Sequence, residues 1–390
     1  MDELLTRGVD QIVGQPELEQ AMSSGRKLRI KFGVDPTRPD LHIGHAVVLR
    51  KLRQFQDLGH TVIFLIGDYT TKIGDPSGKS KTRPMLSDAE IAANVTSYLN
   101  QVGKILNVKQ AEIRYNSEWL GKLTFGDLIG LASNISVAQI IERDDFKNRL
   151  SSGQELALHE ILYPLMQAYD SVALEADMEF GGGDQLFNLL AGRSLQKKLG
   201  QKPQIVFTCE LLVGLDGVKK MSKSLDNYVS FTDASLEMYG KIMSLPDNLI
   251  APYYKLCTQI DLGVIAELVK TLASGANPRD SKASLAREIV REYHGDAAAL
   301  KAESQWIKQF REGGRPDVID EYHVNSPSDL IEILLDSGMA TSKTEARRLI
   351  EQGGVRLDDI PVAGIDEPKI KDGQILQVGK RRYLKLRLKK

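Results

Sequence analysis

The segment from residue 30 to residue 67 constrains the fold more strongly than any other part of the chain. Residues 30–34 alternate apolar and other side chains as a strand does, and the proline-bracketed loop at 35–40 ends that strand because proline lacks a backbone donor. An apolar stripe then predicts a helix over residues 41–58, and the apolar run at 61–67 predicts a buried parallel strand. Strand, helix and strand form a βαβ unit, so we predict an α/β fold with a Rossmann-like parallel sheet.

Other stretches extend this interpretation along the chain. Residues 1–28 have a polar, helical pattern, and residues 87–175 are predicted to be mostly helical, as an insertion between two halves of the sheet. The three glycines at 181–183 permit close approach of the backbone to a ligand. Residues 205–212 predict a further strand, which leads into a lysine-rich loop.

The composition changes twice in the second half of the chain. Residues 233–322 have helical periodicity broken by proline and glycine, and a compact module with its own helix and strand signals begins near residue 327. We therefore predict three domains: a parallel-sheet domain at 1–230, an all-helical domain at 231–325, and a small α+β domain at 327–390.

The C-terminal module carries the strongest local charge. Residues 342–345 form a capping box at the start of a helix whose Arg347 and Arg348 face outwards. The strand predicted from Tyr383 to Lys390 alternates leucine with lysine or arginine, which gives it one wholly basic face. This pattern favours contact with a nucleic acid over a basic tail without a partner.

Composition narrows the class of protein. The net charge is -1, so a site for a polyanion must be a local feature. The two cysteines, Cys209 and Cys257, lack the spacing of a metal site or a disulfide framework, which suits a reducing compartment. The N-terminus lacks the pattern of a signal peptide, and no run of about 18 apolar residues occurs. We therefore expect a soluble cytoplasmic protein that does not contact a membrane.

Two histidines, His42 and His45, stand one helical turn apart at the start of the helix that follows the proline loop. Unpaired backbone N–H groups and the helix dipole favour anions at that position. Thr37 in the preceding loop, with Lys220 and Lys223 in the lysine-rich loop, would add the donors and cations that a triphosphate needs. A zinc pair is the alternative, but no cysteine or carboxylate lies at ligand spacing, so we predict no protein-bound metal.

The stretch from Gly74 to Pro84 predicts a second cationic loop, which includes Lys79 and Arg83. Its length and composition suit a loop that folds over a bound anion. The same composition also fits a solvated surface loop, and both interpretations stay open.

Two short motifs connect these patterns to a known family. His42-Ile43-Gly44-His45 and Lys220-Met221-Ser222-Lys223-Ser224 match the two signatures of class I aminoacyl-tRNA synthetases, in the same order. The segments that resemble the bacterial tyrosyl-tRNA synthetases within that class are Gly33-Val34-Asp35-Pro36-Thr37, Gly74 to Lys79, Tyr163 to Asp170, and Gly183-Asp184-Gln185. The C-terminal module resembles the S4-like RNA-binding domain shared with a ribosomal small-subunit protein. The resemblance spans essentially the whole chain.

The resemblance implies a division of labour among the site residues. Those implied for catalysis at the phosphates are Thr37, His42, His45, Lys79, Arg83, Lys220 and Lys223. Those implied for ATP and the adenylate are Gly33, Asp35, Gly44, Gly182, Asp184, Met221 and Ser222. Those implied for tyrosine are Asp75, Tyr163 and Gln167 around the amino group, Asp170 at the phenol hydroxyl, and Gln185 near the carboxylate.

The resemblance also implies a reaction and its partners. Such an enzyme joins L-tyrosine and ATP, supplied with Mg²⁺, into tyrosyl-adenylate and pyrophosphate, and then transfers tyrosine to the 3′ end of tRNA(Tyr). The family implies a homodimer with its interface at about residues 120–165, and tRNA contacts by the helical domain and the C-terminal module.

Three alternatives remain at this point. They are a tryptophanyl-tRNA synthetase, another adenylyl-transfer enzyme with a His-x-Gly-His motif, and a synthetase-like RNA-binding protein without catalysis. Intact His42, His45, Lys220 and Lys223 argue against the last, because a protein that only binds RNA does not need a triphosphate site.

Three residues depart from the best-known branch of the family. Lys31 stands where that branch has a tyrosine that contacts the phenol, Leu186 replaces a tryptophan, and Val48 replaces a residue that is often polar. A second contact to the phenol is therefore not implied for this chain. Asp170 is our candidate for the residue that selects tyrosine over phenylalanine.

Overall fold

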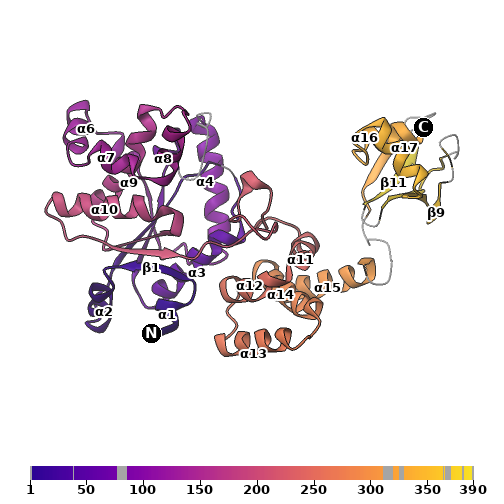
Figure 1. The fold of residues 1–390 in the computed structure, drawn as a ribbon, viewed down its shortest axis with the longest axis horizontal. Helices are drawn as coiled ribbons and strands as arrows, with labels where there is room; N and C mark the ends of the chain where they lie inside the picture. Colours follow the sequence, from indigo (N-terminus) through magenta and orange to yellow (C-terminus); the bar gives the residue numbers. More distant parts are fainter. Residues whose placement is uncertain are drawn as a thin grey trace. The chain divides into compact units, whose positions relative to one another are not determined.

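In the computed structural model the chain forms two compact units, residues 1–296 and residues 297–390 (Figure 1). The residues that the structure describes are 2–37, 39–76, 86–310, 319–324, 329–362, 364, 370–379 and 382–388. A parallel sheet with helices makes up most of the first unit, and a smaller sheet with two helices makes up most of the second.

A six-stranded sheet forms the centre of the first unit. In spatial order its strands are β1 (Val9–Val13), β6 (Ile205–Cys209), β5 (Met178–Gly182), β2 (Arg29–Val34), β3 (Thr61–Ile66) and β4 (Glu112–Tyr115). Only the β1–β6 pair in this sheet is antiparallel. The chain order reverses at β2, which pairs with β3 on one side and β5 on the other. The predicted Rossmann-like sheet is confirmed, and the ends of β2 and β5 form its switch point.

Helices cover both faces of this sheet (Figure 1). On one face α3 (Ile43–Asp57) packs against β3 and β5, and α4 (Asp88–Val102) connects β3 to the segment before β4. On the other face α10 (Leu186–Lys198) packs against β5 and β6, beside α9 (Leu158–Ala173). The other helices around the sheet are α1 (Asp2–Thr6), α2 (Gln15–Ser23), η1 (Thr70–Lys72), α5 (Ser117–Leu120), α6 (Phe125–Ala132), α7 (Val137–Ile141), α8 (Asp144–Ser151), η2 (Gly183–Gln185) and η3 (Lys223–Leu225).

Strand alternation decides which side chains meet which helix layer. Phe180 of β5 and Phe207 of β6 stack with their ring centroids 4.4 Å apart, and both contact Phe55 of α3, at 5.6 and 5.9 Å. Glu179, the neighbour of Phe180, points to the opposite face and accepts a hydrogen bond from Ser171 of α9. Both faces of the central strands are therefore buried, the polar side chains on the α9 face included.

Two strands of the first unit lie where the sequence pattern indicates helix. The helical prediction for residues 1–28 is wrong at β1, which is a short edge strand between Gly8 and Gly14, both at positive φ. An edge strand with one open side tolerates polar residues, so it lacks a clear apolar alternation. At the opposite edge, β4 interrupts the mostly helical stretch 87–175.

A helical segment follows the sheet within the first unit. Its helices are α11 (Ser235–Met243), η4 (Asp247–Leu249), α12 (Ile250–Cys257), α13 (Leu262–Ala273) and α14 (Pro278–His294), and α15 (Asp296–Phe310) begins at the boundary between the units. Arg50 of α3 donates two hydrogen bonds to the Glu292 carboxylate of α14, at 2.9 and 2.7 Å. This pair ties the helical segment to the helix that begins with the two histidines. The domain boundaries at 230 and 325 stay predictions.

The second unit holds a five-stranded sheet and two further helices. In spatial order the strands are β7 (Glu321–Val324), β11 (Arg382–Leu388), β10 (Ile375–Val378), β8 (Val355–Leu357) and β9 (Ile360–Pro361), and the helices are α16 (Leu330–Asp336) and α17 (Lys343–Glu351). The predicted capping residue is present, because the Ser342 Oγ accepts a hydrogen bond from the Glu345 N–H at 3.2 Å. The helical prediction through residue 322 is wrong at its end, where β7 pairs in parallel with β11.

Strand β7 places an acidic side chain beside the basic side chains of β11. Glu321 lies 2.6 Å from the Arg387 guanidinium and 3.9 Å from the Lys385 ammonium, and Asp372 lies 3.7 Å from Arg387. Strand β11 has the predicted alternation, but the surface around its basic side chains is not wholly basic, because β7 and the segment before β10 place acids beside them. Lys389 lies outside the described residues.

We expect the Phe55→Ala substitution to lower the free energy of unfolding by about 3 to 5 kcal/mol, because it removes one ring from a fully buried aromatic cluster between α3 and the sheet and leaves a cavity there. Equilibrium unfolding in urea measures this change. Leu58→Ala is the control, since Leu58 lies at the end of the same helix and is 49 % exposed. A loss for Phe55→Ala no larger than that for Leu58→Ala would contradict the assignment of the core.

Candidate active site

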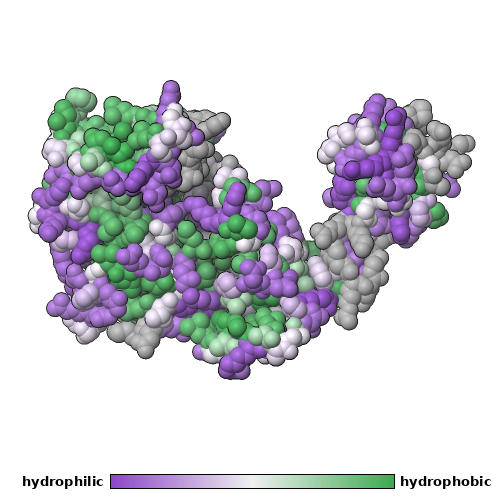
Figure 2. Space-filling view, in the orientation of Figure 1, coloured by the Kyte–Doolittle hydropathy of each residue, from purple (hydrophilic) through white to green (hydrophobic). Residues whose placement is uncertain are grey.

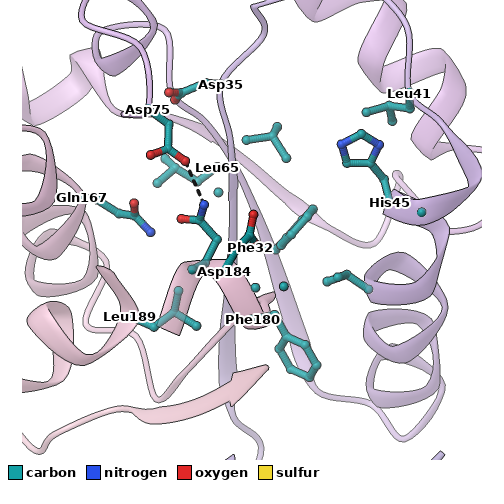
Figure 3. A pocket seen from close by; sticks show the side chains of 18 of the residues that line it. Phe32, Asp35, Leu41, His45, Leu65, Asp75, Gln167, Phe180, Asp184 and Leu189 are labelled. Carbon is teal, nitrogen blue, oxygen red and sulfur yellow. Dashed lines mark hydrogen bonds between the residues drawn. The ribbon is translucent and has the colours of Figure 1, made fainter. Parts of the chain in front are cut away.

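A cavity of about 340 Å³ opens at the switch point between β2 and β5 (Figure 3). Its wall is built from the segment after β2, the start of α3, the inner face of α9, the glycines at the end of β5 and the lysine-rich loop. Figure 3 shows Gln167 and Asp75 on one side of the cavity and His45 on the other. Residues far apart in the sequence thus face one space at the C-terminal end of the sheet, as in other open α/β sheets.

Most of the residues predicted for the site meet at this cavity. Those that line it are Gly33, Asp35, Thr37, His42, Gly44, His45, Asp75, Tyr163, Gln167, Asp170, Gly182, Asp184, Gln185, Lys220, Met221 and Ser222. Lys223 does not line it, although its ammonium lies 5.9 Å from the ring centre of Tyr98, which does. Lys79 and Arg83 lie outside the described residues.

The two histidines form a compact pair at the start of α3. His42 is the extended residue before the helix, its ring lies 3.9 Å from that of His45, and its N–H donates to His45 Nδ1 at 3.2 Å. Burial lowers the pKa of His45 to about 4, and burial with the neighbouring His45 and Lys223 holds the pKa of His42 well below its ordinary value. Both imidazoles are therefore neutral at pH 7, so they offer hydrogen bonds to a ligand and carry no charge.

The lysine-rich loop is fixed by an asparagine that the sequence patterns did not reveal. Asn227 accepts a hydrogen bond from the Ser222 N–H at 2.8 Å and donates to the Lys220 carbonyl at 3.2 Å and to Asp216 at 2.9 Å. The Met221 side chain is buried below the loop. Lys220 then reaches across the cavity mouth, where its ammonium lies 2.6 Å from the Asp184 carboxylate. The loop and the segment after β5 thus hold complementary charges at one end of the cavity.

The middle of the cavity carries carboxylates and amides. Asp35 accepts hydrogen bonds from the Tyr163 hydroxyl at 2.9 Å and from the Thr70 hydroxyl at 2.8 Å. Burial and the neighbouring carboxylates raise the pKa of Tyr163 well above its ordinary value, so Tyr163 stays a hydroxyl donor. The Gln185 amide donates to Asp75 at 2.8 Å, as the dashed line in Figure 3 shows. An organic cation would find several oxygen acceptors here.

Asp170 lies at the buried end of the cavity. The Trp119 indole N–H donates to one of its carboxylate oxygens at 2.8 Å, and the Asn116 amide donates to the other at 3.3 Å. Burial raises the pKa of Asp170 to about 7, against the opposing effects of Lys31 and of these two donors. Asn116 and Trp119 lie at the end of an edge strand and in the short helix after it, and no sequence pattern linked them to Asp170.

Lys31 and Glu179 form a buried ion pair at the same end of the cavity. The Lys31 ammonium lies 2.9 Å from the Glu179 carboxylate, and both residues line the cavity wall. The sequence singled out Lys31 as a departure from the family, but it gave no reason to choose Glu179. Register explains their meeting, because β2 and β5 are parallel neighbours in which Lys31 stands opposite Glu179.

Comparisons with known proteins identify the family. Residues 22–311 match the family described as "tRNA synthetases class I (W and Y)", and residues 330–363 match the S4 domain. The chain is 49 % identical to the tyrosine–tRNA ligase of Moorella thermoacetica, over 98 % of this chain and 94 % of that protein. The chain belongs to the tyrosyl-tRNA synthetase family, within the class I aminoacyl-tRNA synthetases.

Other relatives agree with this assignment. The tyrosine–tRNA ligase of Haemophilus influenzae is 47 % identical, over 99 % of this chain and 96 % of that protein. Among solved structures, a C-terminally truncated mitochondrial tyrosyl-tRNA synthetase from Aspergillus nidulans superimposes with a TM-score of 0.64 at 25 % identity, over 79 % of this chain and 93 % of that one. Class I synthetase membership accounts for the fold and for the two signature motifs at the cavity.

The described residues contain neither a cluster of metal ligands nor a membrane-spanning helix. No group of three or more His, Cys, Asp or Glu side chains there has the arrangement of a metal site. No helix in the same part of the chain is long and apolar enough to cross a membrane.

We expect the buried Asp170 carboxyl to reduce stability as the pH rises from about 4 to about 7. In this range the folded protein keeps a proton that the unfolded chain has already released, so the free energy of unfolding falls with pH. Asp170→Asn removes this titration, and its stability relative to the unmodified protein should increase by about 2 to 3 kcal/mol between pH 5 and pH 8. Urea unfolding at both pH values measures it.

Asp57→Asn serves as the matched control, because Asp57 lies in an exposed pair with Arg53 at the end of α3. Its stability relative to the unmodified protein should change little between the two pH values. An Asp170→Asn variant with the same flat response would contradict the burial of an ionisable carboxyl at this position.

Proposed function

We propose that this chain is a tyrosine–tRNA ligase that activates L-tyrosine with ATP and then transfers the tyrosyl group to the 3′ end of tRNA(Tyr). One observation carries the proposal. A single cavity has a buried carboxylate acceptor at one end, where a phenol hydroxyl would lie, and both class I signature motifs at the other. Membership of the tyrosyl-tRNA synthetase family supports the same conclusion.

Tyrosine would lie across the middle of the cavity. Its hydroxyl would donate to Asp170, whose two oxygens are already oriented by Trp119 and Asn116. A side chain without a hydroxyl would leave this buried carboxylate without a partner, and an unpaired buried polar group is costly. The substrate ammonium would be held by Asp75, Tyr163 and Gln167, and Gln185 would lie near the substrate carboxylate.

ATP would occupy the half of the cavity that faces α3. Backbone around Gly33 and Asp35 would lie against the adenylate, with Asp184 near the ribose. Gly44 and Gly182 line the cavity, and a Cβ at either position would lie within 3.0 Å of a neighbouring side chain, so glycine fits best there. Met221 and Ser222 would form the adjoining wall.

The first chemical step is attack by the tyrosine carboxylate on the α-phosphate, with release of pyrophosphate. Negative charge develops on the phosphate oxygens, so donors and cations fixed around them lower the barrier. Thr37 and the neutral His42 and His45 would donate hydrogen bonds, while Lys220 and Lys223 would provide positive charge. Lys79 and Arg83 would add cations from the segment that lies outside the described residues.

Mg²⁺ would enter with the substrate triphosphate. Histidines, lysines and a threonine surround the proposed phosphate site, and this set of side chains suits phosphate oxygens better than it suits a hard cation. The ion would therefore be held mainly by ATP, whose charge it would partly neutralise.

The second unit would contact the tRNA through α17. Lys343, Arg347 and Arg348 are exposed on this helix, and Arg356 is exposed on the adjoining β8. Because Glu321 partly neutralises the lysine and arginine side chains of β11, helix α17 is the stronger candidate for phosphate contacts. The helical segment after the sheet would approach the anticodon.

A homodimer would use the insertion before β5. Phe125, Ile129, Val137 and Leu158 are large apolar side chains there with exposed fractions between 58 % and 79 %. Figure 2 shows apolar surface gathered over the region of α6 and α7. Exposed apolar area of this kind commonly marks a protein interface. We place the dimer in the cytoplasm, where the two buried thiols would stay reduced.

Exchange of pyrophosphate into ATP, measured with each amino acid in turn, tests the function. The purified chain should respond to tyrosine, and Asp170→Ala should reduce kcat/KM for tyrosine by about 100-fold or more, because it removes the acceptor for the hydroxyl. Asp57→Ala should retain full activity. Exchange that depends on tryptophan, or an Asp170→Ala variant with unchanged tyrosine activity, would refute the assignment.

Charge reversal on α17 tests the proposed RNA surface. The double variant Arg347→Glu/Arg348→Glu should reduce tRNA charging by about tenfold or more at physiological salt while tyrosine-dependent exchange stays unchanged. The comparison variant Lys385→Glu should have a smaller effect on charging, because Lys385 already lies near Glu321. If Lys385→Glu reduces tRNA charging more than the double variant does, the RNA-binding surface lies on β11 and not on α17.

A further inference from the structure

The buried end of the cavity holds a charged pair that the proposed chemistry leaves unexplained. Lys31 of β2 and Glu179 of β5 have exposed fractions of 0 % and 1 %. Removing two charges from water is unfavourable, and an apolar pair of similar volume often packs with equal stability. The pair also borders the pocket proposed for the amino acid. A role in recognition would explain why two charges occupy this position.

Lys31 has no hydrogen-bond donor left for a substrate. A lysine ammonium has three N–H groups. Here three acceptors surround it: the Glu179 carboxylate at 2.9 Å, the Ser171 hydroxyl at 2.8 Å and the Gln167 carbonyl at 3.0 Å. Lys31 therefore does not replace the tyrosine of the best-known branch as a direct contact to the phenol.

Glu179 determines how the Gln167 amide is turned. One Glu179 oxygen accepts from Gln167 Nε2 at 3.3 Å, and the other accepts from Ser171 at 3.0 Å and from Gln204 at 2.6 Å. With its nitrogen held by Glu179, Gln167 has its amide oxygen left for a ligand in the cavity. An oxygen acceptor is the group that a substrate ammonium requires.

The pair also lies beside Asp170. Gln167, Asp170 and Ser171 stand three and four residues apart on α9, so one helix face presents all three. The positive charge of Lys31 favours the ionised form of Asp170, and the negative charge of Glu179 opposes it. An ionised carboxylate is acceptor-only, which suits a phenol O–H donor.

We propose that Lys31 and Glu179 are a positioning pair for amino-acid recognition: Lys31, held against α9 by Ser171 and the Gln167 carbonyl, places a positive charge beside the proposed acceptor of the phenol hydroxyl, and Glu179 orients the Gln167 amide towards the substrate ammonium. Neither residue of the pair forms the bond to the phenol. This inference rests on the proposed function, because Asp170 and Gln167 are assigned to tyrosine there.

Several charged or titratable groups line the cavity together with Asp170 and must be considered in a pH experiment. They come from β2, the segment after β2, the segment after η1, α9 and β5, and they are Lys31, Asp35, Asp75, Tyr163 and Glu179. The charges of Lys31 and Glu179 act directly on Asp170, with opposite sign. Substitution of each member of the pair should therefore move the titration in opposite directions.

The pH profile of kcat/KM for tyrosine, measured by pyrophosphate exchange, tests the pair. For the unmodified chain the value should rise with pH through an apparent pKa near 7. Lys31→Met should move the acid limb of this profile upwards by about one pH unit, with about fivefold lower kcat/KM at pH 7 that recovers at higher pH. Glu179→Gln should move it downwards, because a negative charge next to Asp170 is lost.

Lys51→Met is the matched control. Lys51 of α3 is also buried, and its ammonium donates to the Glu3 and Leu4 carbonyls at 3.4 and 2.8 Å, away from the cavity. The acid limb of the kcat/KM profile of Lys51→Met should lie at the same pH as that of the unmodified chain. Glu179→Gln keeps the size of the side chain, and its amide oxygen can still accept from Ser171 and Gln204 as the carboxylate does.

The outcomes separate the possible roles of the pair. Opposite shifts of the acid limb, with tyrosine still preferred over phenylalanine in Lys31→Met at high pH, would support the proposal. If Lys31→Met instead lowers kcat/KM for tyrosine equally at every pH and no longer prefers tyrosine over phenylalanine, Lys31 contacts the substrate directly. That result would overturn the proposal. If the acid limbs of Lys31→Met and Glu179→Gln move in the same direction, or do not move, the pair has only a structural role and the proposal is refuted. Exchange with another amino acid by the unmodified chain would overturn the proposed function, and the role of the pair with it.

Discussion

The parallel pairing of β2 with β3 on one side and with β5 on the other is the constraint on which the site depends. It makes β2 the strand at which chain order reverses, so the connections from β2 and β5 leave on opposite faces of the sheet and diverge. The cavity lies where they separate. Asp35, the histidine pair and Asp184 face one space because of this topology, although Asp184 is about 140 residues away from the histidines in sequence.

Burial gives the site its electrostatic character. The same low polarity that keeps His42 and His45 neutral raises the pKa of Asp170, and it strengthens the interaction of Asp170 with Lys31. One end of the cavity therefore has neutral imidazoles at a helix start and the Lys220 ammonium near Asp184, whereas the other end has its charges buried inside the protein. In the proposed function, a triphosphate and a phenol would thus be recognised by different physical means within one cavity.

The second unit shows how one unrecognised strand changes a functional prediction. Strand β11 has the alternation that was predicted for it, but the acid that reduces its positive charge comes from β7, which lies about 60 residues earlier. A pattern along one strand cannot reveal its neighbour across the sheet, because pairing joins segments that are distant in the chain. The exposed arginines of α17 were visible from helical periodicity alone, since that pattern is local.

The sequence by itself determined the elements whose signals are local. These include the βαβ unit, the helix that begins at the two histidines, the capping residue at Ser342, and the motifs that identify the family. Tertiary structure decided the partners of those elements: Asn227 beneath the lysine loop, Trp119 and Asn116 on Asp170, and Glu179 opposite Lys31. The physical reason is that hydrogen bonds and ion pairs act over a few ångströms in space, whereas sequence patterns report only neighbours along the chain. Alternation marked Lys31 as a polar residue in a strand, but only the second helix layer made it a buried charge in the wall of the cavity.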